Sequence, residues 1–229
     1  MTHTAFDLVF FDLDGTLLES AAEIAGALND TLVEVGLPPL TRHTVETWIG
    51  HGTRALLRRA FAGQPEDRFP VIQSSFAGHY LERCGTDSRP YPFVMEALAA
   101  LKHRGIRRVV LTNKESRYTH RLLQAHGLEG EFDAVIAGDT LPVQKPDPEG
   151  IRLCLERFRV RADRALMVGD SAIDVQTARN AGVVVWVVPY GYNMGLPIEA
   201  SQPDRIIPDF SVWLPPAETV QISSTRFGG

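Results

Sequence analysis

The pattern of hydrophobic and polar residues divides the chain into three stretches. Residues 8–11 form a short apolar run rich in Val and Phe, which predicts a strand buried on both faces. From residue 18 to about residue 89, apolar residues recur at helical spacing, and we expect helices and no strand there. Beyond residue 89, apolar runs alternate with amphipathic segments, which predicts strands separated by helices.

The middle stretch, residues 18–89, is expected to form a small α-helical domain inserted into the rest of the chain. Gly36 ends its first helix, and Thr53 is expected to be the N-cap of a later one. Phe76 and Tyr80 lie one turn apart on the apolar face of another helix. Because this insertion directly follows the first strand, we expect it to lie over the end of that strand.

The flanking stretches, residues 1–17 and 90–229, are expected to form one α/β core. Strands joined through helices imply right-handed crossovers, so we predict a Rossmann-like, doubly wound parallel sheet with helices on both faces. The strands are expected at the apolar runs 8–11, 106–111, 134–137, 165–168 and 183–188. Residues 223–229 are expected to be a frayed tail.

Composition and charge narrow the class of protein. The chain has 229 residues, a formal net charge of −5 and no long basic block, so nothing in its charge recruits nucleic acid or an anionic membrane. Cys84 and Cys154 are far apart and lack metal-ligand spacing, which favours reduced thiols. The sequence shows no signal segment and no apolar run long enough to cross a bilayer. We therefore expect a cytoplasmic protein, either a monomer or a small homo-oligomer.

Polar residues follow the ends of the predicted strands. The segment 12–16, Asp-x-Asp-Gly-Thr, comes directly after the first strand, where an unpaired carboxylate must leave the sheet. Because the carboxyl ends of parallel strands meet at one edge, we expect several side chains to lie together there. They are Asp12, Asp14, Thr112, Asp170, Asp174 one helical turn later, and Lys145 from the loop 144–147. Acids, a hydroxyl and a lysine at one edge suit a site of phosphoryl transfer.

Electrostatics restricts how such a site can work. Two like unit charges about 4 Å apart repel by roughly 4 kcal/mol at an effective dielectric of 20, and a phosphate monoester is nearly a dianion. A neutral hydrogen bond contributes only about 1 kcal/mol, so hydrogen bonds alone cannot bring an anionic Asp12 to phosphorus. A divalent cation together with Lys145 can offset that repulsion. A set of carboxylates without a His or Cys cluster favours Mg²⁺.

The pentapeptide 12–16 resembles the first motif of the haloacid dehalogenase superfamily, whose commonest members are Mg²⁺-dependent phosphatases. The resemblance implies that Asp12 attacks phosphorus to form an aspartyl-phosphate, while Asp14 protonates the leaving oxygen and later activates water. It also implies that Mg²⁺ is held by Asp12, the Asp14 carbonyl oxygen and Asp170, with Asp174 behind these ligands. Haloacid dehalogenases lack an acid at the position of Asp14, so its presence favours phosphate esters as substrates.

The same resemblance assigns the groups that contact the phosphoryl oxygens. Thr112 and the backbone amides near it are expected to bind these oxygens, and Lys145 is expected to shield them from the nucleophile. The residues expected to share in phosphoryl binding are Gly15, Thr16 and Asn113.

The helical insertion lies where the first class of superfamily cap occurs, and such caps favour small phosphorylated metabolites. The glycine-flanked turn 50–54 offers free amides to an anion, and Arg54 can bind a carboxylate through two hydrogen bonds. Candidate substrate contacts are therefore Gly50, His51, Gly52 and Arg54. An ordinary helix start with surface arginines would show the same residues, and this alternative stays open.

The resemblance narrows to the bacterial phosphoglycolate phosphatases and extends over nearly all of residues 5–215. The segments that carry it are 17–29, 48–52, 190–198 and 203–207. It predicts Mg²⁺-dependent hydrolysis of 2-phosphoglycolate, a small phosphorylated metabolite with a carboxylate, to glycolate and phosphate.

Three alternatives to that function remain. Glu19, Ala22 and His51 depart from the residues usual in those enzymes, so a phosphatase of another small ester, such as a sugar phosphate, is possible. A phosphosugar mutase of the β-phosphoglucomutase type would share the aspartyl-phosphate. A non-catalytic protein that binds a phosphorylated metabolite is disfavoured, because nucleophile, acid, lysine and metal ligands all occur together.

Overall fold

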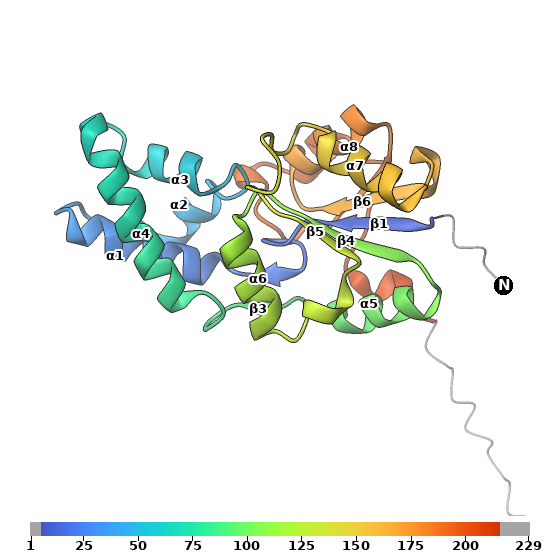
Figure 1. Ribbon diagram of the computed structural model, residues 1–229. Coiled ribbons are helices and arrows are strands. Elements are labelled where there is room, and N and C mark those ends of the chain that lie inside the picture. Colours follow the sequence, from blue (N-terminus) through green and yellow to red (C-terminus); the bar gives the residue numbers. More distant parts are fainter. Residues whose placement is uncertain (1–5, 216–229) are drawn as a thin grey trace, which may run out of the picture.

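A parallel sheet forms the centre of one part of the molecule (Figure 1). The computed structural model describes residues 6–215, so the tail predicted at 223–229 lies outside the described residues. The sheet has six strands in the order β5-β4-β1-β6-β7-β8, all parallel to their neighbours. The strands are β1 Leu8–Phe11, β4 Arg107–Leu111, β5 Ala134–Ile136, β6 Ala165–Gly169, β7 Val184–Val187 and β8 Arg205–Ile206.

β1 is a central strand, and its side chains alternate between the two faces of the sheet. Val9 and Phe11 belong to one buried cluster, while Leu8 and Phe10 belong to another. All four side chains are at most 1% exposed, which explains why the strand has no polar alternation. Complete burial of such side chains stabilises the fold by about 1.5–3 kcal/mol each.

Helices cover both faces of this sheet (Figure 1). Those on one face contribute Leu98 and Leu122 to the cluster of Phe11, and those on the other contribute Ile151 and Val175 to the cluster of Phe10. In that order the helices are α5 Val94–His103, α6 Ser116–Ala125, α7 Glu149–Phe158 and α8 Ala172–Ala181. The predicted doubly wound α/β fold is therefore confirmed.

Four further helices form a group beyond the sheet, at the other end of the molecule (Figure 1). They are α1 Ala21–Glu34, α2 Arg42–Glu46, α3 Thr53–Ala60 and α4 Phe69–Arg83, and we call them the helical group. Leu28 of α1 and Phe76 of α4 lie in the same buried cluster as Phe11 of the sheet. The apolar core thus continues from the sheet into the helical group.

The expectation of no strand from residue 18 to residue 89 was wrong at both ends of that stretch. Leu18–Glu19 (β2) pairs antiparallel with Arg89–Pro90 (β3), so the outgoing and returning connections form a two-stranded ribbon. Two-residue strands carry too little periodicity to be recognised in a sequence. The division of the chain into domains at these positions stays a prediction.

Thr53 is not the N-cap that its position predicted. Gly52 precedes α3 as its N-cap with φ 81°, and Thr53 is the first helical residue. The Thr53 hydroxyl instead donates a hydrogen bond to Glu115 Oε2 at 2.7 Å, which joins the helical group to the α/β core. Thr53 thus bonds to a residue distant in sequence and does not cap its own helix.

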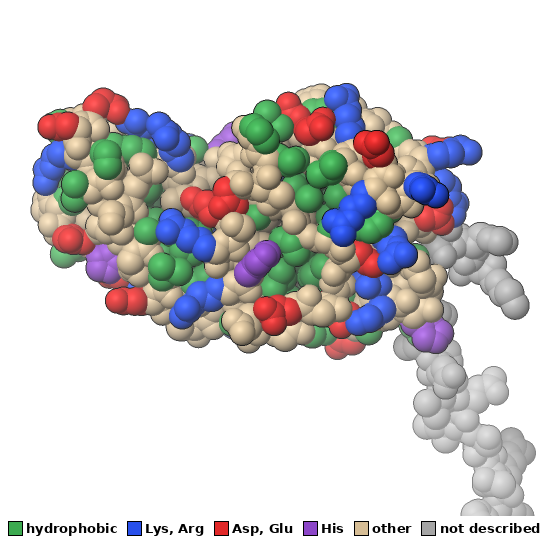
Figure 2. Space-filling model, in the orientation of Figure 1, with side chains coloured by type: hydrophobic (Ala, Val, Ile, Leu, Met, Phe, Trp, Pro, Cys, Tyr) green, Lys and Arg blue, Asp and Glu red, His purple; other side chains and the backbone are tan. Residues whose placement is uncertain are grey.

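On the face drawn in Figure 2, acidic and basic side chains are interspersed over both parts of the molecule. Among the described residues, no helix combines the length and the apolar content needed to cross a membrane.

Candidate active site

Asp12 is the first residue after β1, and it is buried. Its amide donates to the carbonyl oxygen of Val168 in the neighbouring strand β6, which fixes the backbone at this exit. Asp12 Oδ1 lies 2.9 Å from Lys145 Nζ. Burial, with the charge of Asp174, raises the pKa of Asp12 to about 6, although Lys145 and the Leu13 amide oppose the shift. Asp12 is therefore a buried carboxylate with unused acceptor capacity.

Lys145 bridges two buried carboxylates. Its ammonium also contacts Asp174 Oδ1 at 2.7 Å. Burial alone would lower the pKa of Lys145, but Asp12 and Asp174 outweigh it and hold that pKa above its usual value. Asn113 fixes the lysine backbone, since its Oδ1 accepts from the Lys145 amide and its Nδ2 donates to the Lys145 carbonyl. Asn113 thus holds in place the ion-pair network formed by Asp12, Lys145 and Asp174.

Asp174 is the most heavily hydrogen-bonded of the three acids. Its Oδ1 accepts from Lys145, while its Oδ2 accepts from the amides of Asp170 and Ser171 and from the Ser171 hydroxyl. Each carboxylate oxygen offers about two acceptor positions, so Oδ2 is fully used and Oδ1 keeps one. One of these contacts, from the Ser171 amide, is part of a capping box at the start of α8. Asp174 therefore orients Lys145 and the α8 terminus.

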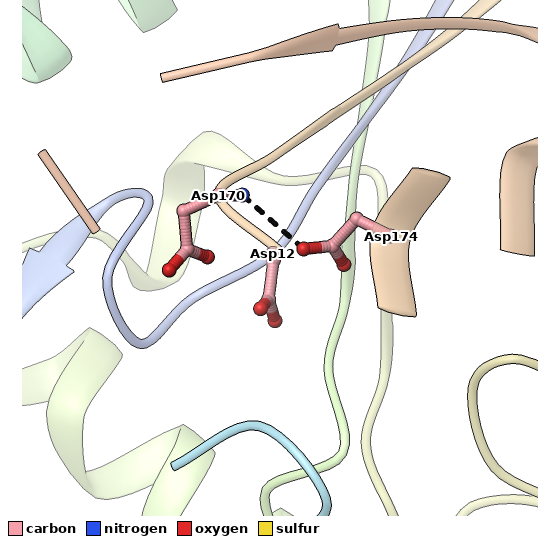
Figure 3. Close-up of side chains that lie close together, drawn as sticks. All are labelled: Asp12, Asp170 and Asp174. Carbon is pink, nitrogen blue, oxygen red and sulfur yellow. Dashed lines mark hydrogen bonds between the residues drawn. The ribbon is translucent and has the colours of Figure 1, made fainter. Parts of the chain in front are cut away.

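Asp170 lies at the end of β6 and faces Asp12. Its Oδ1 accepts from the Thr16 hydroxyl at 2.9 Å, and its Oδ2 accepts from the Tyr192 amide at 2.7 Å. Burial, with the charges of Asp174 and Asp12, raises the pKa of Asp170 well above its usual value. Figure 3 shows the side chains of Asp12, Asp170 and Asp174 gathered around one point.

Two glycines give Asp170 the space that it occupies. A Cβ on Gly15 would lie 2.4 Å from Asp170 Oδ2, and Gly15 has a φ of 86°. A Cβ on Gly191 would lie 2.2 Å from the same oxygen. Neither position tolerates a side chain while Asp170 keeps this place, so Gly15 acts on the site by leaving room.

The donor set fits a hard divalent cation. Oxygen atoms of Asp12, Asp170 and Asp174 all lie within 4.8 Å of one another. Three carboxylates against the one ammonium of Lys145 leave two uncompensated negative charges in a buried place, which is the charge a divalent ion neutralises. Asp170 accepts from Thr16 and Tyr192, and Asp12 forms an ion pair with Lys145 and accepts from Leu13, so both have acceptors free for a metal. Asp174 keeps one acceptor position, on Oδ1.

Asp14 makes a separate ion pair that the sequence did not reveal. Lys114 Nζ lies 2.8 Å and 3.0 Å from the two carboxylate oxygens of Asp14. The Ser20 hydroxyl donates to Asp14 Oδ1 at 2.5 Å. Lys114 follows the predicted Thr112-Asn113 pair directly, but a lysine after a strand is ordinarily solvated. Its place in the Asp12–Asp14 region can be seen only in three dimensions.

A cavity of about 40 Å³ lies between the strand ends and the helical group, which is several times the space one water molecule needs. Its lining residues are Asp12, Asp14, Ile24, Trp48, Ile49, Gly50, Gly52, Thr53, Leu56, Phe76, Tyr80, Thr112, Asn113 and Lys114. The wall from the helical group is mainly apolar, and the opposite wall carries the charged groups.

The predicted residues occupy different places around this cavity. Thr112 lines it, and its Oγ1 accepts from the Lys114 amide. Asn113 Nδ2 donates to the carbonyl oxygens of Gly50 and Lys145, so this side chain connects the helical group to the strand ends. His51 and Arg54 are exposed and do not line the cavity; His51 Nε2 lies 3.2 Å from Met194 Sδ. Their role in substrate binding stays a prediction.

A parallel doubly wound sheet, paired acids after its first strand and a lysine among carboxylates define a class of hydrolase. The chain belongs to the haloacid dehalogenase-like hydrolase family, whose model matches residues 9–188. It is 38% identical to a phosphoglycolate phosphatase of Thiobacillus denitrificans over 208 residues, which are 89% of this chain and 92% of that protein. It is 40% identical to one of Nitrosospira multiformis over 205 residues, covering 87% and 90%.

A solved structure agrees with these relatives. The crystal structure of a predicted phosphoglycolate phosphatase from Haemophilus somnus matches with a TM-score of 0.89 at 37% identity, covering 91% of this chain and 96% of that one. Family and relatives together confirm the superfamily resemblance and the prediction of a phosphoric monoester hydrolase.

Proposed function

We propose that the chain hydrolyses 2-phosphoglycolate to glycolate and phosphate, with Asp12 as nucleophile. The observation that carries this proposal is the buried ion-pair network of Asp12, Lys145 and Asp174 beside a cavity that both Asp12 and Asp14 line. The relatives named phosphoglycolate phosphatases support the choice of substrate.

The proposed metal is Mg²⁺, held by Asp12 and Asp170 together with the Asp14 carbonyl oxygen. When bound, it supplies positive charge that neutralises the phosphoryl oxygens and orients them toward the nucleophile. The four hydrogen bonds that Asp174 accepts, one of them from Lys145, support a place behind the metal ligands for this residue.

In the first half of the reaction, a carboxylate oxygen of Asp12 attacks phosphorus. An Asp12–phosphorus bond forms, and the bond from phosphorus to the glycolate oxygen breaks. Asp14 gives a proton to that departing oxygen, so glycolate leaves as the alcohol. Ser20 and Lys114 orient the Asp14 side chain, which must carry a proton in this half of the reaction and is the ionised acceptor of their hydrogen bonds in the other.

In the second half, water attacks the aspartyl-phosphate. Asp14 takes a proton from the water, the new oxygen–phosphorus bond forms, and the bond to Asp12 breaks to release phosphate. Asp12 returns as a carboxylate and Asp14 as an acid, so the site is regenerated. The reaction consumes one ester and one water.

Lys145 and Thr112 are the proposed contacts of the phosphoryl oxygens. An ammonium has three donors, and Lys145 uses two of them on Asp12 and Asp174, which leaves one for an oxygen of the substrate. The same ammonium holds Asp12 in the ionised form that a nucleophile requires. The Thr112 hydroxyl lines the cavity and can donate to a second oxygen, and Gly15, Thr16 and Asn113 remain proposed partners.

The helical group is the proposed cap over the reaction. Its apolar wall excludes water from the phosphoryl group while the ester is bound, which strengthens the electrostatic interactions inside. Hydrogen bonds from Asn113 to Gly50 and from Thr53 to Glu115 hold that wall against the strand ends.

The test is phosphate release from a panel of small esters, measured with Mg²⁺ and with EDTA. We expect 2-phosphoglycolate to give the highest kcat/KM and EDTA to abolish turnover. A preference for a hexose phosphate would replace the substrate, and isomerised sugar phosphate without free phosphate would indicate a mutase. Turnover that persists in EDTA would overturn the proposed metal.

A further inference from the structure

The substrate of the proposed function carries a carboxylate, and the cavity offers one cation to meet it. Lys114 is the only Lys or Arg among the described residues that line the cavity. Arg54, the contact expected from the sequence, is exposed, and its guanidinium lies 5.7 Å from the centre of the Phe69 ring. Lys145 is committed to Asp12 and Asp174.

We propose that Lys114 binds the carboxylate of the substrate and thereby selects phosphorylated hydroxy acids over neutral esters. This inference rests on the proposed function. It assigns to Lys114 a role in specificity that is separate from the phosphoryl chemistry of Asp12 and Lys145.

The position of Lys114 is fixed by its surroundings. Its carbonyl oxygen accepts from the Gly138 amide at 2.7 Å, and its own amide donates to Thr112 Oγ1 at 3.3 Å. The side chain is 4% exposed, and its ammonium lies 4.8 Å from the centre of the Tyr80 ring. Backbone and stem are thus ordered before any ligand arrives, which lowers the entropy lost on binding.

The ammonium of Lys114 retains capacity for a further anion. It has three donors, and its hydrogen-bond partners among residues 6–215 are the two oxygens of Asp14. The Tyr80 ring presents a face to the cation and takes no proton from it. At least one N–H therefore remains for a ligand.

The chemistry of the leaving group places the substrate carboxylate near this ammonium. Asp14 must reach the glycolate oxygen in order to protonate it, and in 2-phosphoglycolate one carbon separates that oxygen from the carboxylate. A cation bonded to Asp14 therefore lies beside the carboxylate as well. Without Lys114, the substrate carboxylate would be buried with no compensating charge, which is costly.

The rest of the cavity wall explains why one cation decides the preference. Ile24, Leu56 and Phe76 of the helical group line the opposite side and offer a carboxylate no hydrogen bond, and the polar groups of Trp48, Thr53 and Tyr80 beside them are uncharged. A neutral alkyl ester would contact these residues equally well. Selection for an anionic leaving group thus depends on Lys114.

A purely structural role for Lys114, that of orienting Asp14, makes a different prediction. A residue that only orients the proton donor affects every ester to the same extent. A residue that binds the carboxylate affects 2-phosphoglycolate more than an isosteric ester without a charge. Isobutyl phosphate has the shape of 2-phosphoglycolate and no carboxylate, so it separates the two roles.

The experiment compares Lys114→Met and Lys114→Arg with the wild type on both esters. We expect Lys114→Met to lower kcat/KM for 2-phosphoglycolate about 10- to 100-fold more than for isobutyl phosphate, the range for a hydrogen bond between charged groups. Lys114→Arg is expected to restore part of the preference. Lys102→Met, the same change at an exposed ion pair with Glu131, is the matched control.

A binding measurement makes the test independent of turnover. In the Asp12→Asn background, calorimetry should show that adding Lys114→Met weakens the binding of 2-phosphoglycolate more than the binding of isobutyl phosphate. Equal losses for both esters, or a selective loss in Arg54→Met instead, would overturn the inference. If the wild type prefers an ester other than 2-phosphoglycolate, the proposed function is wrong. If it prefers 2-phosphoglycolate but Lys114→Met affects both esters equally, only the role of Lys114 is wrong.

Discussion

The two walls of the cavity are built in opposite ways. The strand-end wall carries charged groups that form ion pairs, as Asp14 does with Lys114 and Asp12 with Lys145. The wall from the helical group consists mainly of apolar side chains, among them Trp48, Ile49 and Leu56. The first wall tolerates little change in position or charge, whereas the second depends chiefly on shape.

This difference determines how much substitution each wall tolerates. A network of buried charges holds each member through its neighbours, so the loss of one affects the whole site. Apolar contacts are individually weak and non-directional, so the helical wall can shift or be substituted with smaller consequences. We therefore expect substitutions at the strand ends to lower activity more than substitutions in the wall from the helical group.

The largest effect is expected for Asp12→Asn. Removal of the nucleophile should lower kcat by about 10⁴-fold or more, since an amide cannot form the covalent intermediate. The fold should survive, because the change removes a negative charge from a crowded buried cluster. Phosphate release and thermal unfolding measure the two results. Asp7→Asn, at an exposed pair with Arg164, serves as control, and near-normal activity of Asp12→Asn would refute the mechanism.

A smaller effect, in the metal dependence, is expected for Asp174→Asn. An amide nitrogen facing Lys145 or the α8 amides brings donor against donor, so the lysine loses its anchor. We expect the apparent affinity for Mg²⁺ to fall about 10- to 100-fold, as for other residues that position metal ligands. A titration of activity with Mg²⁺ measures this. Wild-type Mg²⁺ dependence in this variant would show that Asp174 has no such role.

The smallest effect is expected in the wall from the helical group, for Thr53→Val. The substitution removes the hydrogen bond to Glu115 but keeps the shape of the side chain. A bond of about 1 kcal/mol corresponds to roughly a 5-fold rise in KM, with kcat little changed. Thr44→Val makes the same change in the helical group at a residue that contacts Thr41. If Thr53→Val lowered kcat as strongly as Asp174→Asn does, the contrast between the two walls would fail.

The strand-end wall was largely predictable from the sequence. Carboxyl ends of parallel strands meet at one edge, so the order of strands and polar residues along the chain was enough to place Asp12 and Asp170 together. Lys145 required the family resemblance, because its loop has no periodic signal. The sheet and its helices followed from apolar runs that alternate with amphipathic segments.

The remaining contacts could not be derived from one sequence. Lys114 and Tyr192 act through partners about 100 and 22 residues away, Asp14 and Asp170, and no local pattern indicates such pairings. Gly191 is needed because Asp170 occupies the space of its missing side chain, which is a property of packing alone. Arg54 looked suitable by residue type, but the direction of α3 keeps it outside the cavity.

The central position of β1 has a consequence for synthesis of the protein. β1 is synthesised before both of its partners, β4, which begins at Arg107, and β6, which begins at Ala165. Until both have emerged, the apolar segment Leu8–Phe11 has unpaired backbone edges of the kind that aggregate. A nascent chain that ends before Asp174 therefore lacks both a finished sheet and the lysine–aspartate network.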